Sequence, residues 1–197
     1  MNIAIIDTGC ANIFSVEAAL SRLGVRFVLA QKPDEADGSA RLILPGVGAA
    51  GPAMARLEAS GWADALRQET RPVLGICLGM QLLFERSAEG DVSALGVIPG
   101  EVTEMRAPAN GVLPHMGWNT LSLSSGDEAL TAGIADGSHV YFVHGYAAPV
   151  SEATRALTEY GAPFSAVVRR GNFMGCQFHP ERSGATGRQI LRNFSEL

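Results

Sequence analysis

The sequence predicts an α/β fold, in which a doubly wound, flavodoxin-like mixed sheet carries helices on both faces and an antiparallel β extension. Residues 2–6 and 25–29 are short apolar runs on either side of a segment, 13–23, whose apolar residues repeat at helical spacing, which indicates a β-α-β unit. Residues 41–44 and 73–76 are apolar runs of the kind found in strands buried on both faces of a parallel sheet.

The remaining elements are expected from shorter patterns. We expect a loop or poor helix at 31–40 and a helix over 52–69. From residue 90 onward, β-rich pieces at 96–98, 101–105 and 120–123 indicate the antiparallel extension, with residues 114–119 as a turn between them. Further strands are expected at 140–144, 154–159, 164–168 and 173–178, and a closing helix at 185–195.

Composition predicts a single globular domain over residues 1–197. Hydrophobic residues make up 47% of the chain and charged residues 18%, which is typical of a packed core. Fifteen basic and twenty acidic residues, without a basic block, argue against nucleic acid and anionic membranes as partners. No signal-like segment and no stretch of about 18 apolar residues is present, so we expect a cytoplasmic protein. The three cysteines, Cys10, Cys77 and Cys176, are too widely spaced to predict a disulfide framework or a zinc site.

Cys77 stands between a predicted strand and a predicted helix over 80–85, with Gly75 and Gly79 two residues to either side. In a nucleophile elbow, the reactive residue occupies a strained strand-to-helix turn, and flanking glycines allow close approach of the chain and of a substrate. A helix N-terminus would favour the thiolate, and the amide of Leu78 would face a developing oxyanion. The alternative is that Cys77 is a small buried hydrophobe, as free cysteines often are.

The sequence offers a base for such a nucleophile in His179-Pro180-Glu181. The strand before His179 should end beside the strand before Cys77, and in extended chain the Glu181 carboxylate leaves on the same side as the imidazole. A carboxylate in that position can orient a general base. The other histidines, His115, His139 and His144, have no such neighbour, and we interpret them as structural.

A glycine-rich turn at residues 45–52 follows the strand at 41–44. It could cradle a phosphate, although it lacks the Gly-Lys-Ser/Thr ending of a P-loop. It could equally present backbone amides to an oxyanion, or be a plain tight turn. The turn alone does not decide between these interpretations.

Together these motifs resemble the class I, triad-type glutamine amidotransferases. The elbow from Gly75 to Gln81 and the distant His179-Pro180-Glu181 carry the resemblance to the class. The stretches 45–48, 114–119, 141–144 and 178–184 resemble the glutamine amidotransferase subunits of imidazole glycerol phosphate synthase in particular. The resemblance extends from residue 2 to the end of the chain, and it implies the class I fold as a single amidotransferase domain.

The resemblance implies a role for each site residue. Cys77 would attack the side-chain amide of glutamine, His179 would transfer protons, and Glu181 would orient His179. The other implied positions bind the substrate: Leu78 with Gly46, Val47 and Gly48 for the oxyanion, and Gln81 with the backbone of Val140, Tyr141 and Phe142 for the two ends of glutamine. In this family the segment Gly46-Val47-Gly48, here called the glycine strand, is thought to reorient when a partner subunit binds its own ligand. No metal or organic cofactor is implied.

The implied partner is a cyclase subunit with a (β/α)8-barrel, which forms a heterodimer with the amidotransferase and receives its ammonia. The cyclase then forms imidazole glycerol phosphate and AICAR in histidine biosynthesis. The candidate interface residues are Asn12, His115, Met116, Trp118, Asn119 and Arg182. Departures from the commoner family pattern at Thr8, Ala11, Gly145 and Arg182 concern loops near the partner.

Three alternatives stay open at this point. The chain could be an amidotransferase subunit for another acceptor, such as those of anthranilate, nucleotide or pyridoxal phosphate synthesis. It could be an idle module that only regulates a partner, although no triad residue or oxyanion glycine is missing. It could also be a cysteine peptidase or general hydrolase on the same fold, although Gln81 and the glycine strand fit a small amino-acid substrate better.

Overall fold

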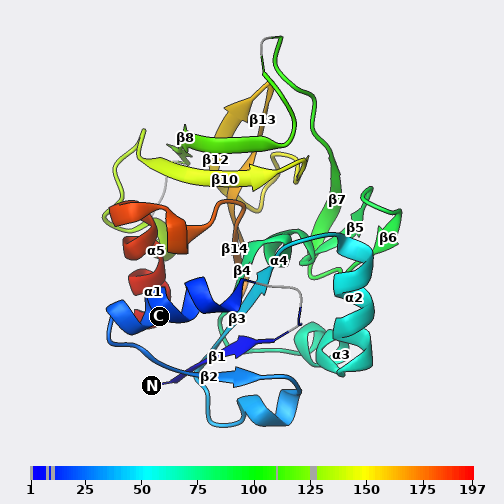
Figure 1. Ribbon diagram of the computed structural model, residues 1–197, viewed down its shortest axis with the longest axis vertical. Coiled ribbons are helices and arrows are strands. Elements are labelled where there is room, and N and C mark those ends of the chain that lie inside the picture. Colours follow the sequence, from blue (N-terminus) through cyan, green and yellow to red (C-terminus); the bar gives the residue numbers. More distant parts are fainter. Residues whose placement is uncertain (1, 8, 10–11, 110, 125–127) are drawn as a thin grey trace.

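The structure, a computed structural model, describes residues 2–7, 9, 12–109, 111–124 and 128–197. Its main sheet has eight strands in the order β2-β1-β3-β4-β14-β13-β12-β9 (Figure 1). The sheet is parallel from β2 to β14 and antiparallel from β14 to β9. The strands are β1 (Asn2–Ile6), β2 (Arg26–Ala30), β3 (Arg41–Gly46), β4 (Val73–Cys77), β9 (Ser122–Leu123), β12 (Thr154–Tyr160), β13 (Ala162–Arg170) and β14 (Phe173–Cys176).

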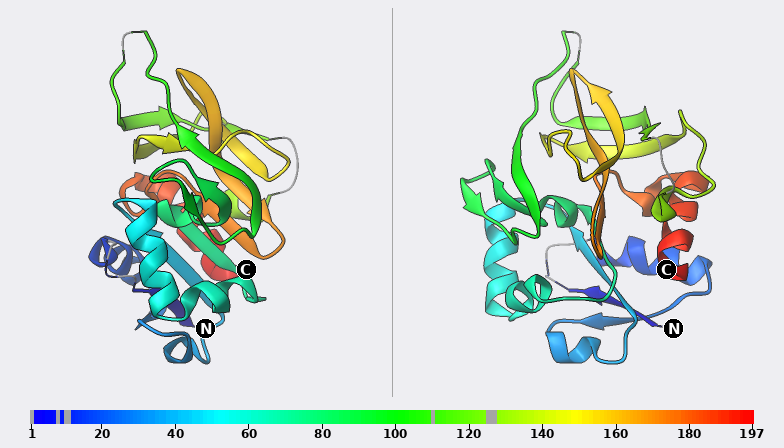
Figure 2. Two further views of the ribbon diagram at one scale, coloured as in Figure 1. Left: turned by 90° about the vertical axis from the view of Figure 1, so that its right-hand side faces the viewer. Right: turned by 180° about the vertical axis from the view of Figure 1, so that it is seen from behind.

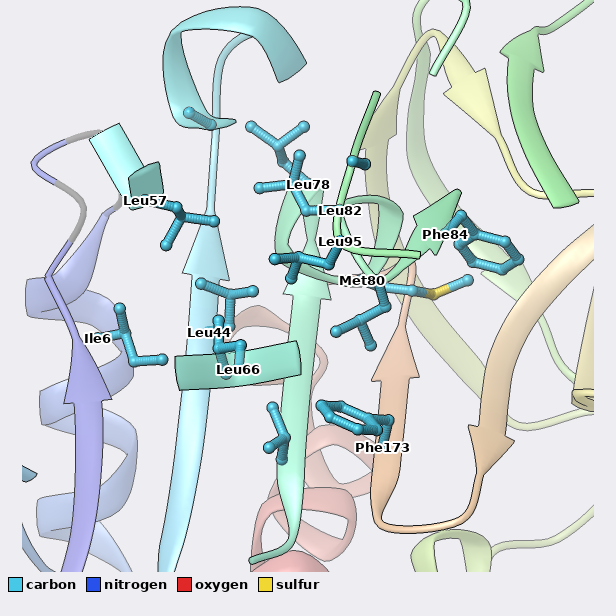
Figure 3. Packing of buried hydrophobic residues seen from close by; sticks show 14 of the residues in the cluster. Ile6, Leu44, Leu57, Leu66, Leu78, Met80, Leu82, Phe84, Leu95 and Phe173 are labelled. Atoms are coloured by element: carbon cyan, nitrogen blue, oxygen red, sulfur yellow. The ribbon is translucent and has the colours of Figure 1, made fainter. Parts of the chain in front are cut away.

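Helices cover both faces of the parallel half of this sheet, as the sequence predicts (Figure 2). Helices α1 (Ile13–Arg22) and α5 (Gly184–Glu196) pack on one face, in a core cluster that includes Leu20 and Phe194. Helices α2 (Ala50–Ala59) and α3 (Trp62–Arg67) pack on the other, in the cluster of Figure 3. Among the described residues, no helix has the length and apolar character needed to cross a bilayer.

The β extension consists of two small sheets in addition to the antiparallel strands of the main sheet. One pairs β8 (His115–Thr120) with β10 (His139–His144), and the other has the order β11-β7-β5-β6. Within the second sheet, β5 and β7 run parallel, and the remaining pairs are antiparallel. The strands of the second sheet are β5 (Phe84–Ser87), β6 (Val92–Ser93), β7 (Ile98–Glu104) and β11 (Tyr146–Ala147).

Several sequence-based boundaries need correction. The helix expected over 52–69 is two helices, because Gly61 between them has a left-handed φ of 81°. The turn expected at residues 114–119 is largely strand β8, whose pairing with β10 is a long-range contact. The loop or poor helix expected at 31–40 agrees with the structure, in which this segment contains the short 3₁₀ turn η1 (Pro33–Ala36). A second 3₁₀ turn, η2 (Ala129–Thr131), precedes β10. Thr8, Cys10 and Ala11 lie outside the described residues.

Three glycines allow the chain to fold tightly around Cys77. Cys77 is followed at once by the single helical turn α4 (Leu78–Gln81), which crosses the ends of β3 and β4. A Cβ on Gly75 would lie 2.6 Å from the carbonyl oxygen of Gly79, and one on Gly46 would lie 2.7 Å from the amide nitrogen of Gly79. A Cβ on Gly79 would overlap the backbone carbonyl of Leu44. The expected close approach at the flanking glycines is therefore confirmed.

We expect Gly79→Ala to lower the free energy of unfolding by about 1–3 kcal/mol, because the clashing atom is backbone in β3 and overpacked cores are destabilised by such amounts. Urea unfolding followed by circular dichroism measures this change. The matched control is Gly145→Ala, because an added Cβ there meets no atom within 4 Å. Equal stability of the two variants would contradict this account of the elbow.

Candidate active site

Cys77 occupies a strained backbone position at the end of β4. Its φ is 54° and its ψ is −111°, a combination that residues with a side chain rarely adopt. The strain expected of an elbow is thus present. The Cys77 Sγ lies 3.7 Å from the carbonyl oxygen of Val143, and it accepts a hydrogen bond from the Nε2 of Gln177 at 3.8 Å.

The helix after Cys77 is shorter than the sequence indicates. Helix α4 ends at Gln81, and Phe84 and Glu85 belong to strand β5, so the helix expected over 80–85 is wrong. The early end follows from tertiary contacts, because Phe84 is fully buried and pairs with Ile98 of β7. A single turn has a weaker dipole than a long helix, so α4 contributes less to the electrostatics of the site than the sequence suggests.

His179 reaches the site from the neighbouring strand, as expected. Strand β14 runs parallel to β4 with Cys176 opposite Ile76, and His179 follows three residues later. The Nδ1 of His179 lies 2.8 Å from the Oε1 of Glu181. The connecting chain is the 3₁₀ turn η3 (Pro180–Arg182), not the extended chain that the sequence suggested, yet the two side chains still meet.

The backbone around His179 is fixed by strand β10. The amide of His179 donates to the carbonyl oxygen of Tyr141 at 2.9 Å. The Ser183 hydroxyl donates to the carbonyl oxygen of His179 at 2.7 Å and accepts from the Tyr141 amide at 2.9 Å. Two of these hydrogen bonds fix the amide and the carbonyl group of His179, and the third ties Ser183 to β10. Together they fix the backbone from which the imidazole extends.

The electrostatic environment keeps His179 protonated. Burial lowers the pKa of His179, but hydrogen bonds and charge interactions with Cys77 and Glu181 outweigh this effect and raise the pKa from about 6.5 to about 10. Since Nδ1 donates to Glu181, the other ring nitrogen is available to Cys77. The arrangement is therefore an imidazolium between a carboxylate and a cysteine, which is the composition of a Cys-His-Glu triad.

Cys77 and His179 line one cavity of about 160 Å³. Pockets for drug-sized ligands are usually about 300–1,000 Å³, so this cavity suits a smaller molecule such as an amino acid. Of the positions expected from sequence, Val47, Gly48, Leu78 and Gln81 also line it. The other lining residues are Glu89, Val143, His144, Gly145 and Tyr146.

Three residues expected to border glutamine lie elsewhere. Val140 and Phe142 are fully buried in the core, and Tyr141 contributes its backbone to holding His179. The next stretch of the chain, from Val143 to Tyr146, forms the cavity wall in their place. Gly46 is paired opposite Cys77 in the sheet, directly before the lining residues Val47 and Gly48.

Glu89 is a site residue that the sequence analysis missed. Its carboxylate lies on the loop between β5 and β6, and Glu89 lines the same cavity as Cys77. One oxygen of the carboxylate accepts a hydrogen bond from the Ala50 amide at 2.9 Å, at the start of α2. A fixed carboxylate beside the nucleophile provides a partner for a cationic group of the substrate. No local motif marks Glu89, so its place became visible only in the fold.

The candidate interface residues divide into two groups. Met116 and Trp118 on β8 are 64% and 56% exposed, which is unusual for large apolar side chains. Asn12 and Arg182 are also exposed, and Asn119 is half-buried. His115 needs correction, because only 3% of it is exposed and its alternating position on β8 turns it inward.

Outside the cavity, we examined Cys176 and possible metal ligands for a chemical role. Cys176 is fully buried, and burial raises the pKa of its thiol, which agrees with a packing role. In the described part of the chain, no group of three or more His, Cys, Asp or Glu residues is arranged to hold a metal ion.

Comparison with known proteins identifies the family. Residues 4–196 match the family model of the class-I glutamine amidotransferases. A protein of Xanthomonas axonopodis pv. citri named imidazole glycerol phosphate synthase subunit HisH is 53% identical over 197 residues, which cover 100% of this chain and 98% of that protein. The protein of the same name in Yersinia pseudotuberculosis is 47% identical over 198 residues, with 100% of both chains covered.

Solved structures show the same fold at lower sequence identity. A structure described as a glutamine amidotransferase has a TM-score of 0.76 and 21% identity, with 98% of this chain and 97% of that chain covered. A structure from Thermoplasma acidophilum, described as part of a GMP synthase, has a TM-score of 0.74 and 20% identity, with 100% of this chain and 92% of that chain covered. The chain therefore belongs to the class-I glutamine amidotransferase family, and within it to the HisH subunits.

Proposed function

We propose that this chain is the glutaminase subunit of an imidazole glycerol phosphate synthase and that Cys77, His179 and Glu181 are its catalytic triad. One observation carries the assignment of the triad: the strained Cys77 and the Glu181-bound His179 line a single small cavity. Identity of 47–53% over the full chain to proteins named as HisH subunits favours histidine biosynthesis over the other acceptors.

In the acylation half, the Cys77 thiolate attacks the side-chain carbonyl carbon of glutamine. The carbon–sulfur bond forms as the carbonyl π electrons move to oxygen, which gives a tetrahedral oxyanion. Collapse of this oxyanion breaks the carbon–nitrogen bond. The imidazolium of His179 gives its proton to the departing nitrogen, so the products are ammonia and a Cys77 glutamyl thioester.

In the deacylation half, the pKa of His179 falls, so that the ring can accept a proton instead of donating one. Two of the interactions that raise this pKa come from Cys77, and both are lost once its sulfur carries the acyl group. Burial then opposes the charged imidazole, while Glu181 alone supports it. The neutral ring can accept a proton from water as the water attacks the thioester, which releases glutamate and restores the thiolate–imidazolium pair.

We assign the oxyanion site to the amide of Leu78 and to the segment Val47–Gly48. Leu78 directly follows the nucleophile, as oxyanion donors do in elbow enzymes. Gly48 has a φ of 94°, and no atom lies within 4 Å of the Cβ position there. This segment therefore has both the backbone freedom and the space to reorient a peptide group, which fits gating by a partner.

The two ends of glutamine need partners of opposite charge. We assign the Glu89 carboxylate to the α-ammonium group, because Glu89 contributes an acidic side chain to the described cavity lining, to which Glu181 does not belong. Gln81 also lines the cavity, and its Nε2 donates to the carbonyl oxygen of Tyr146 at 2.8 Å and to the Oε1 of Gln177 at 3.0 Å. These bonds fix the Gln81 amide for contact with the substrate.

We propose that a (β/α)8-barrel cyclase subunit binds the face that carries Met116 and Trp118. Exposed Met and Trp side chains are typical of interface hot spots. Ammonia released into water near pH 7 is mostly protonated and no longer nucleophilic, so direct transfer to the partner is chemically favoured. This requirement also explains why hydrolysis would be gated by the partner.

We expect the purified chain to release little glutamate from glutamine alone, and at least about 100-fold more with the cyclase and its nucleotide ligand, because the oxyanion site then forms. Cys77→Ala should abolish release under both conditions. Cys176→Ala is the matched control, since Cys176 does not line the cavity. Unchanged glutamate release by the Cys77 variant would refute the nucleophile assignment.

We expect NMR of ¹⁵N-labelled histidine to show His179 as an imidazolium at pH 8, because its pKa of about 10 lies above that pH. Cys77→Ala and Glu181→Gln should each lower the pKa, since each removes a group that favours the charged ring. The solvent-exposed His139 serves as the internal reference. A wild-type His179 that titrates near 6.5 would be inconsistent with the proposed ion pair.

We expect Glu89→Gln to raise the KM for glutamine about 10- to 100-fold with a smaller effect on kcat, because a charge-assisted hydrogen bond to the α-ammonium is lost. The variant keeps an oxygen for the Ala50 amide. Glu85→Gln, on the neighbouring strand β5, is the charge-matched control, because Glu85 does not line the cavity. Steady-state kinetics of the stimulated complex measure both values, and an unchanged KM would rule out this assignment.

A further inference from the structure

Two histidines that the sequence analysis interpreted as merely structural form a buried pair between β8 and β10. Strands β8 and β10 lie side by side (Figure 1), and their register places His115 directly opposite His144. The Nδ1 of His115 lies 3.1 Å from the Nε2 of His144, and the two residues are 3% and 6% exposed. The His115 ring is stacked against Tyr160 and Phe142, with centroid distances of 4.1 Å and 4.9 Å.

The direction of the hydrogen bonds through this pair is determined by its ends. The Nδ1 of His144 lies 2.9 Å from the carbonyl oxygen of Tyr146, which can only accept, so His144 carries its proton on Nδ1. A neutral His144 then accepts at Nε2, so the Nδ1 of His115 donates to it. The Nε2 of His115 accepts in turn from the Asn119 amide at 3.4 Å. Every donor in the series meets an acceptor.

The same series continues to the nucleophile. The carbonyl oxygen of Tyr146 also accepts from the Nε2 of Gln81 at 2.8 Å. The Gln81 amide donates to the Oε1 of Gln177 at 3.0 Å, and the Nε2 of Gln177 donates to the Cys77 Sγ at 3.8 Å. His144, Tyr146 and Gln81 all line the catalytic cavity. Strand β8 is therefore connected to the cavity wall by polar contacts.

Strand β8 has two different faces. Met116 and Trp118 are turned outward and are exposed. His115, directly before Met116, is turned inward and is buried. The sheet of β8 has only β10 as a partner in the described part of the chain, and β10 leads directly into the wall residues Val143 and His144. A shift of β8 would therefore act on the cavity chiefly through β10 and the histidine pair.

We propose that His115 is a positioning residue for glutamine: through His144 it holds the Tyr146 carbonyl, and thereby the Gln81 amide, in place, and it links the exposed face of β8 to the catalytic cavity. This inference rests on the proposed function, since it assigns Gln81 to the substrate. His115 does not itself line the cavity, so it acts through its neighbour and not on the reacting atoms.

The protonation states agree with this arrangement. Burial lowers the pKa of His115 to about 4. Burial, together with the charges of His115 and His179, lowers the pKa of His144 to about 4, although its bond to the Tyr146 carbonyl opposes the shift. Both rings are then neutral at pH 7, as the series requires, because an imidazolium has no acceptor nitrogen.

The first test is ¹⁵N NMR of histidine-labelled free chain at pH 7. We expect both His115 and His144 as neutral tautomers that carry the proton on Nδ1. An Nε2-protonated tautomer or an imidazolium at either position would overturn the proposal, because the donor series could not exist. This readout does not need glutamine hydrolysis, so its failure is distinct from that of the proposed function, which would show as no glutamate release by the wild-type complex.

The second test distinguishes the effect of the Nδ1–H donor of His115 from the effect of the packing of its ring. His115→Phe keeps an aromatic ring but removes the donor, whereas His115→Asn loses the ring but places an N–H near the position of Nδ1. With the cyclase and its nucleotide ligand at saturation, we expect the KM for glutamine to rise at least about tenfold in the Phe variant, since buried acceptors are left unpaired. The Asn variant should stay closer to wild type in KM, despite lower thermal stability.

Phe164→Leu is the control for packing alone. Phe164 contacts the His144 ring with a centroid distance of 5.0 Å and provides no donor or acceptor from its side chain. It should lower the melting temperature while leaving the KM within about twofold of wild type. A Phe variant of His115 with a wild-type KM, or an Asn variant no better than the Phe variant, would overturn the positioning role.

Discussion

The close packing of three glycines at the end of the central strands is the constraint on which the site depends. Gly46, Gly75 and Gly79 come from β3, β4 and α4, and a Cβ on any of them would meet backbone of the neighbouring element. This contact holds the chain in a turn too tight for a normal conformation at Cys77, which therefore has a positive φ. The strained turn places the sulfur at the sheet edge where β14 delivers His179.

Much of this arrangement could be predicted from sequence, because it depends on local patterns and on rules for parallel sheets. Apolar runs predicted the four parallel strands β2, β1, β3 and β4, and the β-α-β rule predicted that their carboxyl ends lie at one edge of the sheet. That edge brings Cys77 and His179 together across adjacent strands. The Glu181 contact was also expected, although the chain achieves it with a 3₁₀ turn.

The features that could not be predicted depend on contacts between distant segments. Helix α4 stops after one turn because Phe84 is needed in the core and in β5. The segment from Pro114 to Asn119 has turn-like composition, but pairing with β10 makes most of it a strand. Glu89 carries no motif, and the motif at 141–144 does not show which of its residues face the substrate. Only the folded chain places Glu89 and the wall from Val143 to Tyr146 at the cavity.

The electrostatics of the site restrict how a partner could control it. The pKa of His179, raised to about 10, means that its ring is already an imidazolium near pH 7 without a partner. Under the proposed mechanism, a partner therefore has no need to change the protonation of His179. Stabilisation of the oxyanion is a separate requirement, and Val47–Gly48 has the conformational freedom to supply or withhold a donor. Under the proposed mechanism, we therefore expect a partner to act on the backbone of Val47–Gly48, while the protonation of His179 stays unchanged.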